Sequence, residues 1–226
     1  AYREAVEGAE LVCLSSVCWT TGTRLPVAEL TEIAHDAGAR VLVDAAQSVG
    51  QHPVDVEAWG ADAVAASGHK WLLATWGSGF LYVDPEAHDR LLQTRIGYRS
   101  VTDPTAADYT YYEGGRRFEV GTTSPAPYVA LAEAVETMEA VGLDTVQSHV
   151  ETLTDRLKAG LGDRVLSPAE YESGLVSFTA ADPEATVERL ADEGIVVRSL
   201  PHPDAVRASV HVFNTRADVD ALLDAL

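Results

Sequence analysis

The chain has 226 residues, of which 35 are acidic and 16 are basic, and its formal net charge is −19 at pH 7. This excess of carboxylates argues against nucleic acid as a partner, because binding to a phosphate backbone needs clustered Lys and Arg side chains. No apolar run reaches the ~18 to 20 residues that cross a bilayer, so we expect no membrane span. Two cysteines are too few for a disulfide framework, and no signal-peptide pattern opens the chain, so we expect a cytoplasmic protein.

The acidic surface has almost no lysine to balance it. Lys70 and Lys158 are the only lysines in the sequence. We interpret the carboxylates as a solvated surface that keeps the protein soluble, with an acidic interaction face as the alternative. The composition also raises the hypothesis of a halophile-like protein in a salt-rich cytosol.

The first half of the chain alternates short apolar strands with helical segments. The elements predicted in chain order are a helix end over 1–10, a strand over 11–17, a helix over 27–37, and strands over 41–47, 62–70 and 77–84. Pro26 marks the start of this helix and Gly38 its end. The first ten residues contain no initiator Met and resemble the end of a helix, so we expect the chain to begin inside a domain.

The second half has a different pattern. From about Pro125, apolar residues with helical spacing predict a long bridging helix that is broken at Gly142. The later segments predict strands over 175–180, 195–200 and 206–214, and helices over 183–194 and 217–226, the last capped by Thr215. The tract from Ile96 to Arg117 is rich in Gly, Tyr and Arg without periodicity, which indicates a long functional loop.

These elements predict the α/β fold class. Apolar strands that alternate with helices form right-handed crossover units, which give a mainly parallel sheet covered on both faces. We therefore predict a large α/β domain over residues 1–124, incomplete at its N-terminus. The bridge helix and a small C-terminal α/β domain follow over residues 125–226.

Polar side chains end two of the predicted strands. Asp44 and Gln47 end one, and Ser67, His69 and Lys70 end the next. Lys70 follows Asp44 by 26 residues, which is enough for a strand, a crossover and the next strand. Ligands of open α/β sheets bind at the carboxyl ends of the strands, so we expect the two groups to face one crevice. We also expect Asp44 to be a buried carboxylate that needs a cationic partner.

The residues around this crevice resemble those of a known family. The motifs VLVDAAQ, SGHK and FEVGT occur together and in the order found in class V aminotransferases, which include cysteine desulfurases and isopenicillin N epimerase-like enzymes. The later segments GIVVRSL and VRASVHVFNT resemble the substrate-binding stretch of that family. The resemblance covers nearly the whole chain, and it implies a fold-type-I enzyme that binds pyridoxal phosphate.

The resemblance also implies roles for the cofactor-binding residues. Lys70 would hold the cofactor through a Schiff base and carry a proton at the substrate Cα. Asp44 would pair with the pyridine nitrogen and keep it protonated. Gln47 would hydrogen-bond the phenolic oxygen, while Ser67 and His69 would hold the phosphate.

Two further residues extend the implied site. Thr122 would reach the phosphate of a neighbouring subunit, which implies a homodimer with shared active sites. Arg207 would bind the carboxylate of an amino-acid substrate with its planar guanidinium, and Arg198 is a second candidate for the same pocket. Without the family, Thr122 is equally an ordinary loop hydroxyl and Arg207 an exposed strand residue.

The chain also departs from the family pattern. Ser16 stands where desulfurases carry an Asn, and the segment 200–206 lacks the nucleophilic Cys that desulfurases place there. We expect Cys13 and Cys18 to be small buried hydrophobic residues rather than nucleophiles. The family also has an upstream region that supplies the phosphate loop and a ring-stacking side chain.

The sequence therefore predicts a pyridoxal-phosphate enzyme with no metal site, which acts on an amino acid by transamination, epimerisation or β-elimination. One alternative is a cysteine desulfurase, which the missing Cys disfavours because sulfur transfer by that route requires a thiolate. The other is a truncated family member without catalytic activity.

Overall fold

A computed structural model describes residues 1–226, apart from the side chain of His88. The chain divides into two compact units, which are described separately. The first unit comprises Ala1–Ser16, Pro26–Ala46 and Val54–Glu136, and the second comprises Val17–Leu25, Gln47–Pro53 and Thr137–Leu226. Two loops from the first half of the sequence thus pack with the C-terminal unit. The domain division at residue 124 stays a prediction.

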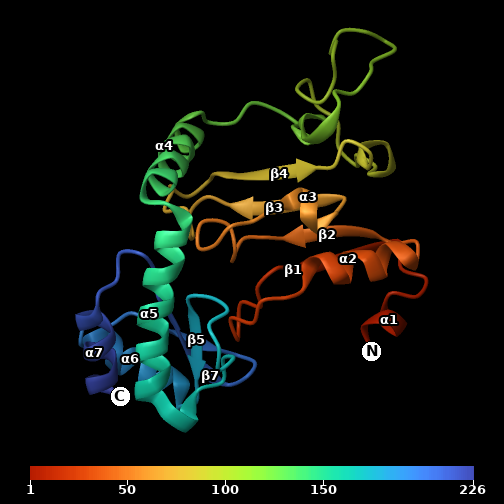
Figure 1. The fold of residues 1–226 in the computed structure, drawn as a ribbon. Helices are drawn as coiled ribbons and strands as arrows, with labels where there is room; N and C mark the ends of the chain where they lie inside the picture. Colours follow the sequence, from red (N-terminus) through yellow and green to blue (C-terminus); the bar gives the residue numbers. More distant parts are fainter. The chain divides into compact units, whose positions relative to one another are not determined.

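The first unit is built on a four-stranded sheet in the order β1-β2-β3-β4 (Figure 1). The strands are β1 (Leu11–Ser15), β2 (Arg40–Asp44), β3 (Ala63–Ser67) and β4 (Gly79–Val83). The first three strands are parallel, and β4 pairs with β3 in the antiparallel direction. The predicted mainly parallel α/β architecture is confirmed.

Helices connect these strands. The first unit contains α1 (Tyr2–Ala5), α2 (Val27–Asp36), α3 (Val56–Trp59), the 3-10 turns η1 (His88–Arg90) and η2 (Gly114–Phe118), and most of α4 (Ala126–Val141). The helix α2 packs on β2, and Ile33 and Ala34 of α2 are buried, as are Val41 and Val43 of β2. Burying each of the larger side chains contributes about 1.5 to 3 kcal/mol, so this layer holds the strand ends in place.

The strand β1 is less buried than its apolar sequence predicts. Leu11 and Cys13 are exposed, whereas alternate residues of a strand share one face. The strand lies at the edge of the sheet, next to β2 only, so it has fewer neighbours than the central strands. This edge position explains the exposure of Leu11 and Cys13.

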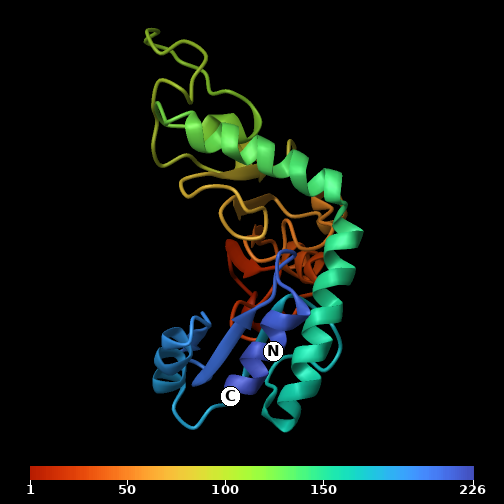
Figure 2. The same ribbon diagram turned by 90° about the vertical axis from the view of Figure 1, so that its left-hand side faces the viewer.

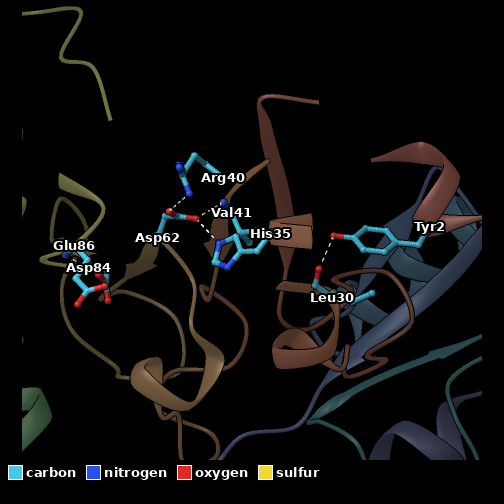
Figure 3. A network of polar contacts seen from close by, with 8 residues as sticks. All are labelled: Tyr2, Leu30, His35, Arg40, Val41, Asp62, Asp84 and Glu86. Atoms are coloured by element: carbon cyan, nitrogen blue, oxygen red, sulfur yellow. Dashed lines mark hydrogen bonds and ion pairs between the residues drawn. The ribbon is translucent and has the colours of Figure 1, made fainter. Parts of the chain in front are cut away.

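A buried carboxylate, Asp62, lies near the N-terminal ends of β2 and β3 (Figure 3). Asp44 and Ser67 are at the other ends of these strands. Asp62, which precedes β3, accepts a hydrogen bond from the Val41 backbone at 2.7 Å. The same carboxylate lies 2.8 Å from His35 Nε2 and 3.5 Å from Arg40 Nη1. Because its partners satisfy the charge, this network has a structural role in joining α2, β2 and β3.

The second unit contains a three-stranded antiparallel sheet in the order β5-β7-β6. Its elements are α5 (Leu143–Leu161), η3 (Gly162–Arg164), β5 (Leu175–Phe178), α6 (Pro183–Asp192), β6 (Arg198–Leu200), β7 (Ala205–Ser209) and α7 (Arg216–Ala225). The helices α5 and α7 pack side by side, and α6 packs on β6 and β7 (Figure 2). The predicted helix break at Gly142 is confirmed, with φ at +86°, and Thr215 begins α7 with a capping box.

The tract from Ile96 to Arg117 is largely irregular, as the sequence predicts. Within it, Val101 and Tyr111 form an isolated antiparallel bridge, and η2 begins at Gly114. Among the described residues, no helix combines the length and the apolar character that a membrane crossing requires.

His52 makes the stability of the second unit dependent on pH. The side chain is 2% exposed, and burial, followed by the charge of Arg24, lowers its pKa to about 4. An unfolded His titrates near 6.5, so the unfolded state binds more protons between these two values. The stabilisation is fully present above about pH 6.5 and is lost as the pH falls through 4.

We expect the free energy of unfolding to fall by about 2 to 3 kcal/mol more between pH 7.5 and 4.5 in the wild type than in His52→Gln. Urea unfolding at each pH measures the difference. His202→Gln is the control, because His202 is exposed, and it should retain the wild-type dependence. Equal pH dependence in His52→Gln and the wild type would show that His52 is not buried in its neutral form.

Candidate functional site

The two predicted groups of polar residues begin at neighbouring strand ends. Asp44 is the last residue of β2, Ser67 is the last residue of β3, and the register pairs Asp44 with Ala65. The backbone of Asp44 is fixed further, because its carbonyl accepts a hydrogen bond from the Ser16 amide at 2.9 Å. The carboxyl ends of these parallel strands therefore meet at one edge of the sheet, as the sequence predicts.

The Asp44 side chain is exposed, so the expectation of a buried carboxylate was wrong. Asp44 terminates β2, and its Oδ1 accepts a hydrogen bond from the Ala46 amide at 2.9 Å. A carboxylate at this position needs no cationic partner from its own unit, since water solvates it. Its second oxygen is able to accept a hydrogen bond from a ligand.

The turn after β3 holds Lys70 in a defined backbone conformation. The Gly68 amide donates to the Ser78 carbonyl at 3.0 Å, and the Ala74 amide donates to the Gly68 carbonyl at 2.9 Å. A Cβ atom at Gly68 would lie 2.6 Å from the Ser78 hydroxyl, so the turn requires glycine there. Leu73 has φ at +61°, a strained conformation for a non-glycine residue, and such strain is concentrated at functional sites.

Ser67 and His69 have features that fit a phosphate. The Oγ atom of Ser67 is buried and has no hydrogen-bond partner among the described residues. An unsatisfied buried hydroxyl is costly, and a phosphate oxygen would accept its hydrogen bond. The His69 ring stacks on Trp76, with 4.1 Å between ring centroids and 17° between planes, which restrains the imidazole. The residues at this strand end therefore fit the phosphate of pyridoxal phosphate.

The second lysine of the chain has a structural environment instead. Lys158 belongs to α5, and its Nζ donates to the carbonyls of Glu170 at 2.8 Å and Ala169 at 3.4 Å. Burial lowers the pKa of Lys158. Its amine ties α5 to the segment before β5, which leaves Lys70 as the candidate for covalent attachment.

Thr122 belongs to the first unit, in the segment between η2 and α4. Its hydroxyl is hydrogen-bonded to that of Tyr98, and both side chains are exposed. Thr122 lines a pocket of about 840 Å³ together with Phe80 of β4, Arg99 and Arg116. The lining of this pocket does not include Asp44, Ser67 or Lys70. The lining does include Gly79, the register partner of Ser67, and the role of Thr122 toward another subunit stays a prediction.

Gln47 and Arg207 belong to the second unit. Gln47 begins a loop in which Gln51 is completely buried and accepts a hydrogen bond from the Gly174 amide at 2.8 Å. The Arg207 Nη1 atom donates to the Trp19 carbonyl at 2.7 Å, and its Nε atom is buried without a hydrogen-bond partner among the described residues. Arg207 therefore retains an edge of its guanidinium that a carboxylate would fit.

The cysteines are not the buried hydrophobic residues that the sequence led us to expect. Cys13 is exposed because it belongs to the edge strand β1, and Cys18 is half-buried in the loop Val17–Leu25. Burial raises the pKa of the Cys18 thiol, but hydrogen bonds from Thr20 and Thr21 outweigh it and lower the pKa to about 7. Cys18 is therefore a more reactive thiol than its apolar neighbours predict.

Sequence reasoning also missed two aromatic residues. Trp76 stacks on His69, and Trp19 lies beside Arg207. Both tryptophans occur in short polar or Gly-containing segments, where a large aromatic residue is unusual, and that was the available signal. No group of three or more metal-binding side chains occurs among the residues whose side chains are described.

Comparisons with known proteins show the family of the chain. The family model described as Aminotransferase class-V matches residues 3–222. A probable cysteine desulfurase from Methanothermobacter thermautotrophicus is 33% identical over 97% of this chain and 60% of its own length. The chain thus spans about 60% of the length of that relative.

Solved structures show the same likeness. One is a complex between the cystine C–S lyase C-DES and its reaction product cysteine persulfide, with TM-score 0.88, 32% identity, and coverage of 96% of this chain and 61% of that one. Another is a C-DES mutant with glycine covalently linked to its PLP cofactor, with TM-score 0.90, 30% identity, and coverage of 99% and 63%. The chain therefore belongs to the class V aminotransferase family of pyridoxal-phosphate enzymes, as its motifs predict.

Proposed function

We propose that the protein is a pyridoxal-phosphate enzyme that cleaves the Cβ–S bond of a sulfur-containing amino acid by β-elimination. The named relatives support a sulfur substrate, because one is a probable cysteine desulfurase and another is a cystine C–S lyase. The observation that carries elimination is that the connection between β6 and β7 contains no cysteine, while β7 keeps Arg207.

The residues at the strand ends would hold the cofactor. Ser67 and His69 would bind its phosphate, and the exposed carboxylate of Asp44 would accept a hydrogen bond from its ring nitrogen. Gln47 would hydrogen-bond its phenolic oxygen. When bound, the cofactor supplies an electron sink for the pair released at the substrate Cα.

Two residues would act on the substrate. The Lys70 amine, once released from the cofactor, would take the Cα proton, because an amine at this position is a suitable general base. Arg207 would hold the substrate carboxylate. The Cβ–S bond then breaks, and its electron pair leaves with the sulfur. With cystine and one water the products are pyruvate, ammonia and cysteine persulfide, which balances all atoms without an added oxidant or reductant.

The β6–β7 connection disfavours the desulfurase route. It consists of Pro201, His202, Pro203 and Asp204, and all four residues are exposed. None of them offers the thiolate that must attack a substrate sulfur. His202 could exchange protons with a leaving group, but at an exposed position it is equally suited to be a surface residue.

A cysteine desulfurase that uses Cys18 is the second candidate. The lowered pKa of this thiol favours it, as does the loop it shares with Trp19, whose carbonyl contacts Arg207. In that case sulfur would be transferred to Cys18 as a persulfide rather than released.

Product analysis separates the two candidates. Protein expressed from its complete coding sequence should convert L-cystine to equal amounts of pyruvate and ammonia, with persulfide in solution. Cys18→Ser should retain activity within about twofold, and Cys13→Ser is the matched control.

A persulfide on Cys18 that forms during turnover with L-cysteine, together with loss of activity in Cys18→Ser, would establish the desulfurase. Keto acid from L-alanine without sulfur release would instead indicate transamination, and no turnover of any of these amino acids would support the non-catalytic alternative.

We also propose that the enzyme is a symmetric homodimer with shared sites. Large apolar side chains are exposed between residues 73 and 129 of the first unit, and exposed apolar patches mark interfaces. They include Trp76, Phe80, Leu81, Leu92, Tyr98 and Val129.

Mixing two inactive variants tests this arrangement. A hybrid of Lys70→Ala and Thr122→Ala subunits contains one site in which both residues are intact. Random exchange should therefore restore about a quarter of wild-type activity, since half of the dimers are hybrids and half of their sites are complete. No recovery despite demonstrated subunit exchange would place Thr122 outside the partner's site.

A further inference from the structure

Three carbonyl groups of the loop Val17–Leu25 fix it to the sheet of the second unit and to the segment just before β5. The Trp19 carbonyl accepts from Arg207 at 2.7 Å, the Thr20 carbonyl accepts from Ser177, and the Gly22 carbonyl accepts from Ser173 at 2.7 Å. Ser177 and Arg207 are register partners on β5 and β7. The path of the loop is therefore set by side chains of this sheet.

Close packing at Gly22 fixes the loop further. Gly22 has φ at +75°, and a Cβ atom there would lie 2.4 Å from the Leu175 carbonyl oxygen. Any larger residue would push the loop away from β5. The hydrogen bonds of the loop and the close approach of Gly22 to β5 thus together restrain the position of Trp19.

The Trp19 ring lies beside two arginines that pair with none of the described acidic side chains. The centroid of the ring is 5.3 Å from Arg198 Cζ and 5.9 Å from Arg207 Cζ. Arg198 and Arg207 are register partners on β6 and β7, and no ion pair with a described residue holds either of them. The negative face of an indole ring attracts guanidinium groups, so Trp19 offsets part of the repulsion between them.

These contacts leave one edge of the Arg207 guanidinium with a nitrogen that has no hydrogen-bond partner among the described residues. Its Nη1 atom is engaged by the Trp19 carbonyl, whereas its Nε atom is buried without a partner among the described residues. The edge formed by Nε and Nη2 is a planar pair of donors, which matches the two oxygens of a carboxylate. Because the Trp19 carbonyl already restrains the Arg207 guanidinium, the side chain loses less rotational freedom when a carboxylate binds to its other edge.

We infer that Trp19 is a positioning residue, which orients the Arg207 guanidinium so that its Nε edge receives the substrate carboxylate. This inference rests on the proposed function, because it assumes that the ligand of Arg207 is the carboxylate of an amino acid. Trp19 itself does not touch the reacting atoms in this account. Its effect is on the affinity for a carboxylate, whatever reaction follows.

Two amines separate the carboxylate contact from the rest of the site. Glycine carries a carboxylate and methylamine does not, and both are able to react with bound pyridoxal phosphate. Their dissociation constants are measured from the absorbance change of the cofactor in protein expressed from its complete coding sequence. Trp19→Leu keeps an apolar side chain but removes the aromatic face, and Trp19→Phe restores an aromatic face.

We expect Trp19→Leu to weaken glycine binding about tenfold and methylamine binding less than twofold. Trp19→Phe should stay within about threefold of the wild type for glycine. Phe213→Ala is the control, because Phe213 is a largely exposed aromatic residue of the same unit, and it should leave both constants unchanged.

The outcomes distinguish this inference from the proposed function. If Trp19→Leu weakens glycine and methylamine equally, or neither of them, Trp19 does not position the carboxylate clamp, while the proposed function stands. If Trp19→Phe behaves as Trp19→Leu, the aromatic face is not responsible and the inference is wrong. If the wild type shows no cofactor absorbance that responds to either amine, the proposed function fails, and the inference fails with it.

Discussion

Replacing Lys70 with Ala should reduce turnover by at least about 10³-fold. Under the proposed function the variant would lose both the covalent attachment of the cofactor and the general base at the substrate Cα, and general base catalysis alone contributes about 10² to 10⁴-fold. Steady-state rates with L-cystine measure the loss. The turn itself should stay folded, because its backbone hydrogen bonds, such as Gly68 to Ser78, do not involve the lysine side chain.

Lys158→Ala is the matched control for this variant. Lys158 donates to backbone carbonyls before β5, so its removal should affect stability and leave turnover within about twofold. Retention of more than a tenth of wild-type activity in Lys70→Ala would remove Lys70 from the catalytic role. A larger loss of turnover in Lys158→Ala than in Lys70→Ala would show that Lys158, and not Lys70, has the catalytic role.

Asp44→Asn should lower turnover by at least about tenfold while the protein still binds the cofactor. In the proposed site the carboxylate would keep the pyridine nitrogen protonated, and a neutral amide of the same shape would not. A tenfold loss corresponds to about 1.4 kcal/mol of barrier stabilisation. The Asn side chain still accepts the hydrogen bond from the Ala46 amide, so the end of β2 should be unchanged.

Asp55→Asn is the control for this substitution. Asp55 is an exposed carboxylate of the same unit that accepts a hydrogen bond from the Ala58 amide at 2.9 Å, as the N-cap of α3. Asn is also a good N-cap, so this variant should stay within about twofold of the wild type. If Asp44→Asn is as active as Asp55→Asn, Asp44 does not support the electron sink.

The sheet edge at Asp44 and Ser67 could be predicted from the sequence. Parallel strands with short crossovers place their carboxyl ends together, and each of these strands ends in polar residues after an apolar run. The helix break at Gly142 was also readable, because glycine marks backbone conformations that other residues avoid. Local sequence determines these features, so no knowledge of distant contacts was needed.

The surroundings of Arg207 could not be predicted in the same way. The hydrogen bond between the Trp19 carbonyl and Arg207 joins residues 188 positions apart in the sequence. No periodicity in the loop Val17–Leu25 predicts this contact. The pKa of Cys18 depends on the hydroxyls of Thr20 and Thr21, and therefore on loop geometry rather than on the apolar residues before it. The exposure of Asp44 and Cys13 follows from positions at a strand end and at a sheet edge, which pattern alone does not reveal.

Borohydride reduction followed by peptide mapping tests the central claim most directly. Protein expressed from its complete coding sequence is incubated with pyridoxal phosphate, reduced, digested and analysed by mass spectrometry. Lys70 and Lys158 are the only lysines among the 226 residues, so a label within this chain falls on one of two peptides. We predict a pyridoxyl group on Lys70. A label on Lys158, or no label on either lysine, would contradict the account.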